Sequence, residues 1–333
     1  MNPSPDPAPP PFRAPAWCRN PHLQTLWPVV AGRHPSPPLR RQRLELPDGD
    51  FLDLDWLRDA PADPAAPVLL ILHGLQGSSR SHYARRLLAL AARRGWRAAV
   101  MHFRGTSGEP NRLARSYHSG ETADLGHVLG HLADACPRAP RVVIGVSLGG
   151  NVLLKWLGEA GGRAPVDAAL AVSVPLDLAA SSRHLDRGLA RLYRDRLLRD
   201  LKGALRAKAA RRPLPIDLAA ALRARTFTEF DARVTAPLHG FAGAEDYYRR
   251  CSAVRFLAGI RAPTWILQAR DDPFLPAAAL PDPGALPSCV QLALSAHGGH
   301  VGFVAGRPWA PRYWLEVVAG VLLASVSRRK TAA

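Results

Sequence analysis

The chain has 333 residues, 47% of them hydrophobic, which suffices for one large α/β domain with an insertion or for two ordinary domains. Its 27 Gly and 32 Pro fall short of a fibrous or disordered composition. The formal net charge is +17, but no helix-turn-helix, zinc-finger or RNA-binding signature accompanies it, which argues against a nucleic acid partner. Either compositional bias, since Ala and Pro are also abundant, or attraction to an anionic membrane surface explains the excess of Arg.

The N-terminal quarter predicts a tail, a short ordered segment and a hairpin. Residues 1–16 are Pro-rich and lack the charged start and apolar run of a signal peptide, so a disordered tail is expected. Residues 20–28 are expected to be ordered, and pinning the N-terminus across the domain is the favoured role for Asn20–Thr25. Two alternating runs, 41–46 and 51–57, flank an Asp-Gly step that predicts a β-hairpin.

The central part of the sequence alternates short apolar runs with amphipathic ones. Strands are predicted at 68–72, 97–103, 141–146, 168–174, 262–269 and 290–294, and helices at 81–94, 121–135 and around 151–157. Short, almost wholly apolar strands separated by helices indicate an α/β fold with a mostly parallel sheet and helices on both faces.

Two segments depart from this alternation. Residues 178–228 have helical periodicity and no strand signal, which predicts a helical cap inserted into a single domain that spans 17–327. Residues 313–326 are apolar, but they are interrupted by Glu316 and are shorter than the ~20 residues that cross a membrane. They predict a core-packed helix before a basic tail at 328–333.

The four cysteines form no CxxC pair, which favours reduced thiols and a cytoplasmic location.

The sequence Gly145-Val146-Ser147-Leu148-Gly149 matches the G-x-S-x-G pattern of a nucleophile elbow. It follows an apolar strand and opens a helix, which is the context the pattern requires, and side chains at the two glycines would collide with strand and helix. Ser147 is therefore the candidate nucleophile; the alternative is an ordinary turn with an exposed serine.

The candidate oxyanion hole combines two backbone N–H groups. One belongs to Leu148, directly after the nucleophile, and the other to Leu75, in the Gly-rich turn 73–78 after the first central strand. The alternative is a Gly-rich turn that binds nothing.

Candidates for the acid and the base follow the last two predicted strands. Asp272 is preferred to Asp271 as the acid because the next residue, a proline, fixes the turn that presents it. His300, among glycines, is preferred to His297 as the general base. A metal site from the two histidines is disfavoured because no third ligand is nearby. The order Ser147, Asp272, His300 is that of the triad in this fold class.

Beyond these motifs, the chain resembles the YheT-like branch (AB hydrolase family 4) of the α/β-hydrolase superfamily over residues 17–327. The resemblance rests on Asn20–Thr25, the 73–75 and 145–151 motifs, Phe230-Asp231, Thr235-Ala236-Pro237, Gly240-Phe241, Asp246-Tyr247-Tyr248, 271–274 and 297–303. It implies hydrolysis of carboxylic esters, short-chain or lipid-like, by the same triad without a cofactor. Gln76 departs from the family, which more often carries an acidic residue there.

Three other functions are compatible with these residues. The first is an acyltransferase in which an alcohol intercepts the acyl-enzyme. The second is a non-catalytic protein on the same fold, and the third is a peripheral membrane protein whose main role is lipid binding. In each case the partner is a small-molecule ester or lipid.

Overall fold

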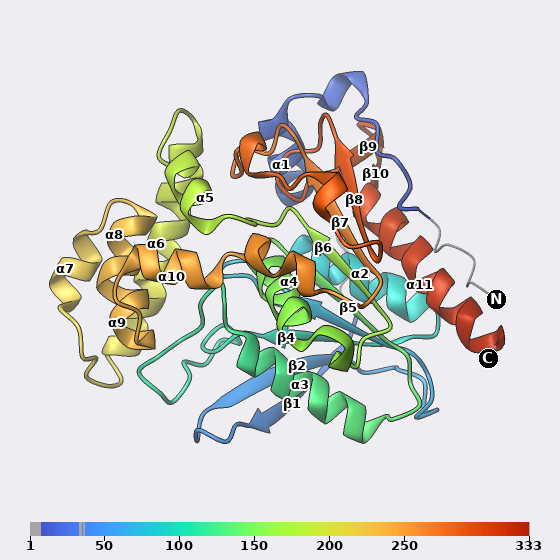
Figure 1. Ribbon diagram of the computed structural model, residues 1–333, viewed down its shortest axis with the longest axis horizontal. Helices are drawn as coiled ribbons and strands as arrows, with labels where there is room; N and C mark the ends of the chain where they lie inside the picture. Colours follow the sequence, from blue (N-terminus) through green and yellow to red (C-terminus); the bar gives the residue numbers. More distant parts are fainter. Residues whose placement is uncertain (1–7, 33–34, 36, 333) are drawn as a thin grey trace.

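The computed structural model describes residues 8–32, 35 and 37–332. Its eight-stranded sheet has the order β1-β2-β4-β3-β5-β6-β7-β8 (Figure 1). The strands are β1 (Leu39–Glu45), β2 (Phe51–Leu57), β3 (Val68–Leu72), β4 (Arg97–His102), β5 (Arg141–Val146), β6 (Ala168–Val172), β7 (Thr264–Ala269) and β8 (Val290–Ser295). The first two form the expected antiparallel hairpin and β2 is antiparallel to β4, whereas every pair from β4 to β8 is parallel. The predicted mostly parallel α/β sheet is confirmed.

Helices cover both faces of the sheet because successive strand residues point to opposite sides. In β3, Leu70 and Leu72 belong to the core shared with α3 and α4, and Leu69 and Ile71 belong to the core shared with α2 and α11. These helices are α2 (His82–Arg93), α3 (Thr122–Ala135), α4 (Leu148–Ala160) and α11 (Trp314–Ala332). A strand that serves two cores must be apolar at every position, and all five residues of β3 are buried.

A group of helices between β6 and β7 lies to one side of the sheet and is called the cap below (Figure 1). The cap consists of α5 (Leu178–Leu185), α6 (Ala190–Ala209), α7 (Leu218–Arg223), α8 (Phe227–Phe230), α9 (Ala236–His239) and α10 (Ala244–Cys251), with a π-helical turn at Asp231–Thr235. Helices thus continue past residue 228, the expected end of the insertion. Pro237, Gly240 and Gly243 divide that stretch into pieces too short to show helical periodicity.

The N-terminal segment is more ordered than expected. Residues 1–7 of the predicted tail lie outside the described residues, but Phe12 is buried and packs edge-on against Phe303, with ring centroids 5.5 Å apart. The indole N–H of Trp314 donates to the carbonyl oxygen of Pro10 (3.2 Å). Helix α1 (Pro21–Val30) follows and is capped by Asn20, whose side chain accepts two backbone N–H groups. Aromatic packing therefore overrides the Pro-rich composition of residues 8–16.

The C-terminal segment also differs from the prediction. A hairpin of β9 (Val304–Arg307) and β10 (Ala310–Tyr313) precedes α11. Its four-residue strands contain Gly and Pro and carry too little alternation to be predicted. Helix α11 continues to Ala332, so residues 328–332 belong to the helix and not to a tail. Among the described residues, no helix is both long and apolar enough to cross a membrane.

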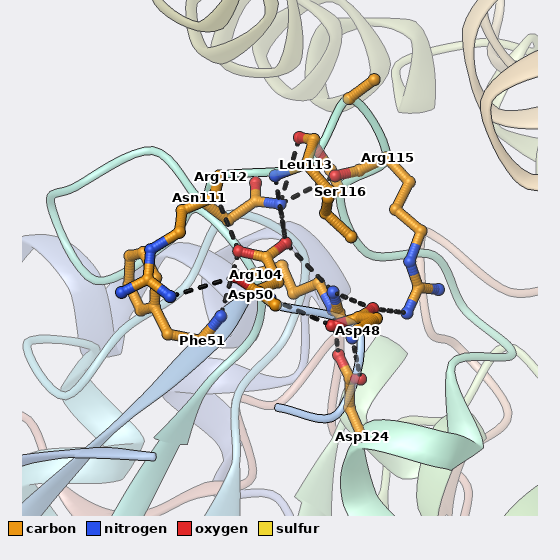
Figure 2. Close-up of polar contacts among 12 residues, drawn as sticks. Asp48, Asp50, Phe51, Arg104, Asn111, Arg112, Leu113, Arg115, Ser116 and Asp124 are labelled. Carbon is orange, nitrogen blue, oxygen red and sulfur yellow. Dashed lines mark hydrogen bonds and ion pairs between the residues drawn. The ribbon is translucent and has the colours of Figure 1, made fainter. Parts of the chain in front are cut away.

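A buried ion cluster lies beneath the loop that joins β4 to α3. The guanidinium of Arg104 is buried and contacts the carboxylates of Asp48, Asp50 and Asp124 at 2.8, 3.0 and 2.6 Å (Figure 2). Although burial alone lowers it, the pKa of Arg104 is raised overall by Asp124 and Asp48. Pairing offsets the cost of burying these charges, because Asp124 accepts two hydrogen bonds from Arg104 and Asp50 has several partners.

Asp50 connects this cluster to the loop. Its fully buried carboxylate accepts the backbone N–H of Arg112 (2.8 Å) and the side-chain amide of Asn111 (2.5 Å) (Figure 2). From the cap, Lys208 of α6 donates to the carbonyl oxygen of Arg115 (2.7 Å). The loop is therefore held between the sheet and the cap.

We expect Asp50→Ala to lower the free energy of unfolding by about 3 kcal/mol, because it removes one carboxylate partner of Arg104 and the buried acceptor of both the Asn111 amide and the Arg112 N–H. Urea denaturation measures the change. Glu45→Ala is the matched control, since Glu45 pairs with Arg112 at the exposed surface and should change stability little. Equal losses in the two variants would contradict this account of the loop.

Candidate active site

Ser147 lies at the junction of β5 and α4 in a left-handed backbone conformation (φ 52°, ψ −117°). This conformation is strained for any residue other than glycine. A Cβ on Gly145 would lie 2.5 Å from the carbonyl oxygen of Gly149, and one on Gly149 would lie 2.6 Å from that of Leu72. The close approach of strand, turn and helix thus requires glycine at both flanking positions, which is the steric reason that the motif suggested.

The structure brings Ser147, His300 and Asp272 together. Nε2 of His300 lies 3.0 Å from Oγ of Ser147, and Nδ1 of His300 lies 2.9 Å from Oδ2 of Asp272. The Asp272 side chain is completely buried, and its other oxygen accepts the N–H of Phe274 (2.8 Å). A buried carboxylate on one ring nitrogen leaves the other nitrogen free to accept the serine proton.

The two alternative residues form a separate pair. Asp271 contacts Nδ1 of His297 at 3.1 Å, and it also accepts the N–H of Gly299 (3.0 Å). The two histidines therefore face different carboxylates instead of one common centre. Asp271 supports the loop that carries His300 and does not contact the imidazole of His300.

The oxyanion-hole candidates face the nucleophile from two elements. Leu148 begins α4, where the first N–H groups have no partner within the helix. Leu75 follows Gly74, on which a Cβ would lie 3.3 Å from that of Ser147. Within the described part of the chain, neither the Leu75 nor the Leu148 N–H donates a hydrogen bond to a protein group. Both are available to an oxygen bound beside Ser147.

Two tyrosines hold the turn that carries Leu75, and sequence reasoning missed both. Oη of Tyr83 accepts the N–H of Gly74 (2.8 Å), and Oη of Tyr117 accepts the N–H of Gln76 (2.9 Å). Burial raises the pKa of both tyrosines, so both hydroxyls stay protonated at neutral pH. Gln76, at the position where the family more often has an acid, has a positive φ of 52° and lines the cavity.

A cavity of about 710 Å³ extends from Ser147 and His300 into the space beneath the cap. Leu26 and Val29 of α1, Leu178 and Leu185 of α5, and Leu197, Leu201 and Leu205 of α6 are among its apolar lining residues. Its volume falls within the range of small-molecule sites, and the lining is suited to an acyl chain.

The cavity wall includes a carboxylate, that of Asp231, which lies outside the group formed by Ser147, His300 and Asp272. Asp231, in the π-helical turn of the cap, accepts hydrogen bonds from Oγ1 of Thr235 (2.6 Å) and Oη of Tyr248 (2.7 Å). Burial raises the pKa of Asp231 to about 6, although both hydrogen bonds act in the opposite direction. Asp231 therefore fastens the turn to α10 and titrates near neutral pH.

A second polar cluster has the residue types of a metal site, but two of its three members already have other partners. Potential ligand atoms of His118, Glu121 and His239 lie within 4.8 Å of one another. Nδ1 of His118 accepts the N–H of Gly120 (3.1 Å), which places the proton on Nε2, the nitrogen facing Glu121 at 3.6 Å. Glu121 is also paired with Arg115 at 3.0 Å. Nδ1 of His118 and the carboxylate of Glu121 are thus already paired with other groups of the protein.

The raised pKa of Asp231 predicts a pH dependence of stability. The folded-state pKa exceeds the ~3.9 of an exposed Asp, so this contribution is present below pH ~4 and is lost as the pH rises through about 6. Asp231→Asn cannot titrate. Between pH 4 and pH 7 its stability should therefore rise relative to wild type by about 2 kcal/mol, allowing for access of water to the cavity. Thermal unfolding across this range measures the difference, and parallel curves for the two proteins would refute it.

Comparison with known proteins identifies the family. Residues 67–306 match the family model described as the alpha/beta hydrolase fold. YheT of Escherichia coli (strain K12), which is named as an esterase, is 47% identical over 299 residues, 89% of this chain and 88% of YheT. Phospholipase ABHD3 of Mus musculus is 33% identical over 87% of this chain and 72% of its own length. The Pyrococcus furiosus esterase Pf2001 shares the fold, with a TM-score of 0.57 over 98% of this chain and 99% of that chain at 15% identity. The chain therefore belongs to the α/β-hydrolase family, in the branch that contains YheT.

Proposed function

We propose that this protein is a serine hydrolase that cleaves carboxylic esters. The observation that carries the proposal is the continuous line of contacts from buried Asp272 through His300 to Ser147, at 2.9 and 3.0 Å. The esterase and phospholipase names of the relatives favour an ester as the bond that is cleaved.

In the proposed mechanism, the acyl group is transferred to Ser147 and then to water. Nε2 of His300 takes the proton as Oγ of Ser147 attacks the ester carbonyl carbon, and Asp272 stabilises the imidazolium. The N–H groups of Leu75 and Leu148 bind the oxyanion, assisted by the positive end of α4. The tetrahedral intermediate collapses with loss of the alcohol, which takes its proton from His300. Water, activated by the same histidine, then hydrolyses the acyl-enzyme, and no cofactor is needed.

We propose a lipid-like ester as the substrate. The cavity is apolar along α5 and α6 and large enough for an acyl chain, whereas a short ester would leave most of its 710 Å³ unfilled. An acylglycerol or a phospholipid combines such a chain with a carboxylic ester.

The four cysteines form no disulfide, which fits action in the reducing cytoplasm.

A surface beside the cavity has the composition of one that binds an anionic membrane. Leu26, Val29 and Val30 of α1 are 45%, 61% and 77% exposed, and Leu189 and Leu192 at the start of α6 are 62% and 68% exposed. His22 of α1 contacts Tyr193 of α6 at 3.0 Å, so the two apolar groups lie near each other. Arg183, Arg187 and Arg191 are exposed on the same part of the cap, and none forms an ion pair with another described residue. Apolar side chains beside cations suit an anionic lipid surface.

The nucleophile is tested by p-nitrophenyl ester hydrolysis across acyl lengths. Ser147→Ala should abolish turnover, and the preferred chain length should exceed that of acetate because of the cavity volume. A fluorophosphonate probe should label the wild type and not the variant. Equal rates in the two proteins would rule out the triad, and failure of the wild type both to turn over and to be labelled would indicate a binding function.

The choice of acid is tested by paired substitutions at adjacent positions. Asp272→Asn should lower kcat by roughly 10³–10⁴-fold, because the imidazole loses its orienting carboxylate. Asp271→Asn should have a much smaller effect, since Asp271 contacts His297 and Gly299 instead. A larger loss in Asp271→Asn would reverse the assignment.

The membrane surface is tested by sedimentation with phosphatidylcholine vesicles, with and without phosphatidylglycerol. Binding should require the anionic lipid and weaken as salt is raised. Val30→Asp combined with Leu192→Asp should reduce binding at least tenfold and leave hydrolysis of a soluble ester unchanged. Val317→Asp, at a 36% exposed position of α11, is the control and should bind like the wild type. Equal binding by the double variant would exclude this surface.

A further inference from the structure

The loop between β8 and β9 presents His300 on strained backbone. Val301 and Phe303 have φ angles of 61° and 43°, in the left-handed region that β-branched and bulky residues rarely adopt. Such conformations persist only where surrounding contacts hold them. One of these contacts is the hydrogen bond from the N–H of Val301 to Oγ of Ser173, at 2.9 Å.

Helix α1 supplies the contact at His300 itself. Oγ1 of Thr25 accepts the backbone N–H of His300 (2.9 Å) and donates to the carbonyl oxygen of Pro21 (2.7 Å). The neighbouring Gln24 is completely buried; its Oε1 accepts the N–H of Val304 (2.6 Å) and its Nε2 donates to the carbonyl oxygen of Val304 (3.0 Å). Two consecutive side chains of α1 thus hold His300 and the strand that follows it.

The backbones of α1 and the loop are in direct contact. A Cβ on Gly299, whose φ is 57°, would lie 2.5 Å from the carbonyl oxygen of Pro21. A Cβ on Gly302 would lie 2.2 Å from the carbonyl oxygen of Gln24. The glycines around His300 therefore allow this helix to pack against the loop.

A second set of contacts connects α1 to the face of the imidazole. His22 contacts and stacks on Tyr193 of the cap, with ring centroids 5.7 Å apart, and the Tyr193 ring lies 4.9 Å from that of Phe274. The Phe274 ring stacks on the imidazole of His300 at 4.0 Å and 2°. The helix thus acts on the backbone of His300 directly and on its ring through two aromatic side chains.

We infer that α1 is a positioning element for the general base, with Thr25 as the residue that sets the position of His300. The inference rests on the role of His300 in the proposed function. Nε2 must stay within hydrogen-bonding distance of Ser147, and a displacement of ~1 Å at a reacting group can lower the rate ~100-fold. Removing the Thr25 acceptor leaves the His300 N–H without its partner and frees the strained loop to move.

The decisive comparison uses three variants. Thr25→Val keeps the shape and removes the acceptor, and it should lower kcat by about 10- to 100-fold with KM nearly unchanged. Thr25→Ser keeps the acceptor and should retain most of the activity. Thr264→Val is the matched control, because Thr264 is a buried threonine at the start of β7 whose hydroxyl donates to the carbonyl oxygen of Ala262. It should lower the melting temperature without lowering kcat.

A measurement independent of turnover separates this inference from the proposed function. NMR titration of the His300 imidazole, assigned with His300→Gln, should give a displaced midpoint in Thr25→Val and an unchanged midpoint in Thr25→Ser and Thr264→Val. Unchanged kcat and midpoint in folded Thr25→Val, or a Thr25→Ser variant as impaired as Thr25→Val, would overturn the positioning role. If wild-type protein neither hydrolyses esters nor reacts with the fluorophosphonate, the proposed function fails, and the NMR comparison still decides whether Thr25 positions His300.

Discussion

At the junction of β5 and α4, the backbone reverses direction within one residue, and the arrangement of the site follows from this turn. Ser147 takes a left-handed conformation there, and neighbouring backbone approaches closely enough to exclude a Cβ at Gly145 and at Gly149. The turn ends a strand that has neighbours on both sides, β3 and β6. The strain is therefore borne at the end of an interior strand, where Ser147 and the first N–H groups of α4 lie close together.

The wall of the cavity depends on buried charges, one of which, Lys208, also lines it. The loop after β4 has little regular structure, and its backbone groups are paired with Asp50 from the hairpin and Lys208 from the cap. Burial lowers the pKa of Lys208 to about 8, so its ammonium needs the carbonyl oxygens that it contacts. The same loop is hydrogen-bonded to Asp50 of the hairpin and to Lys208 of the cap. It therefore fixes the cap relative to the sheet and maintains the shape of the cavity between them.

The sequence patterns predicted the strands of the sheet and the turn at Ser147, but they did not predict hydrogen bonds between segments that are far apart in the chain. The apolar strands and the glycines around Ser147 follow from local sterics and burial, so they could be read directly. The preference for Asp272 over Asp271 rested on Pro273, and the structure adds a contact that the sequence does not reveal, the N–H of Phe274 on the Asp272 carboxylate. The roles of Tyr83 and Tyr117 could not be predicted, because the neighbouring sequence does not show whether a buried tyrosine accepts a backbone N–H.

The position of His300 at the end of β8 explains why support from α1 is needed. Ser147 follows a central strand, whereas β8 is at the edge of the sheet, where β7 is its only neighbour among the described strands. A loop leaving an edge strand lacks a second strand to restrain it, yet the base must be placed as accurately as the nucleophile. Thr25 is 275 positions from His300 in the chain, so the local sequence around either residue does not predict their contact. The N-terminal helix takes the place of the missing neighbouring strand and, through Thr25, contributes the acceptor for the His300 N–H.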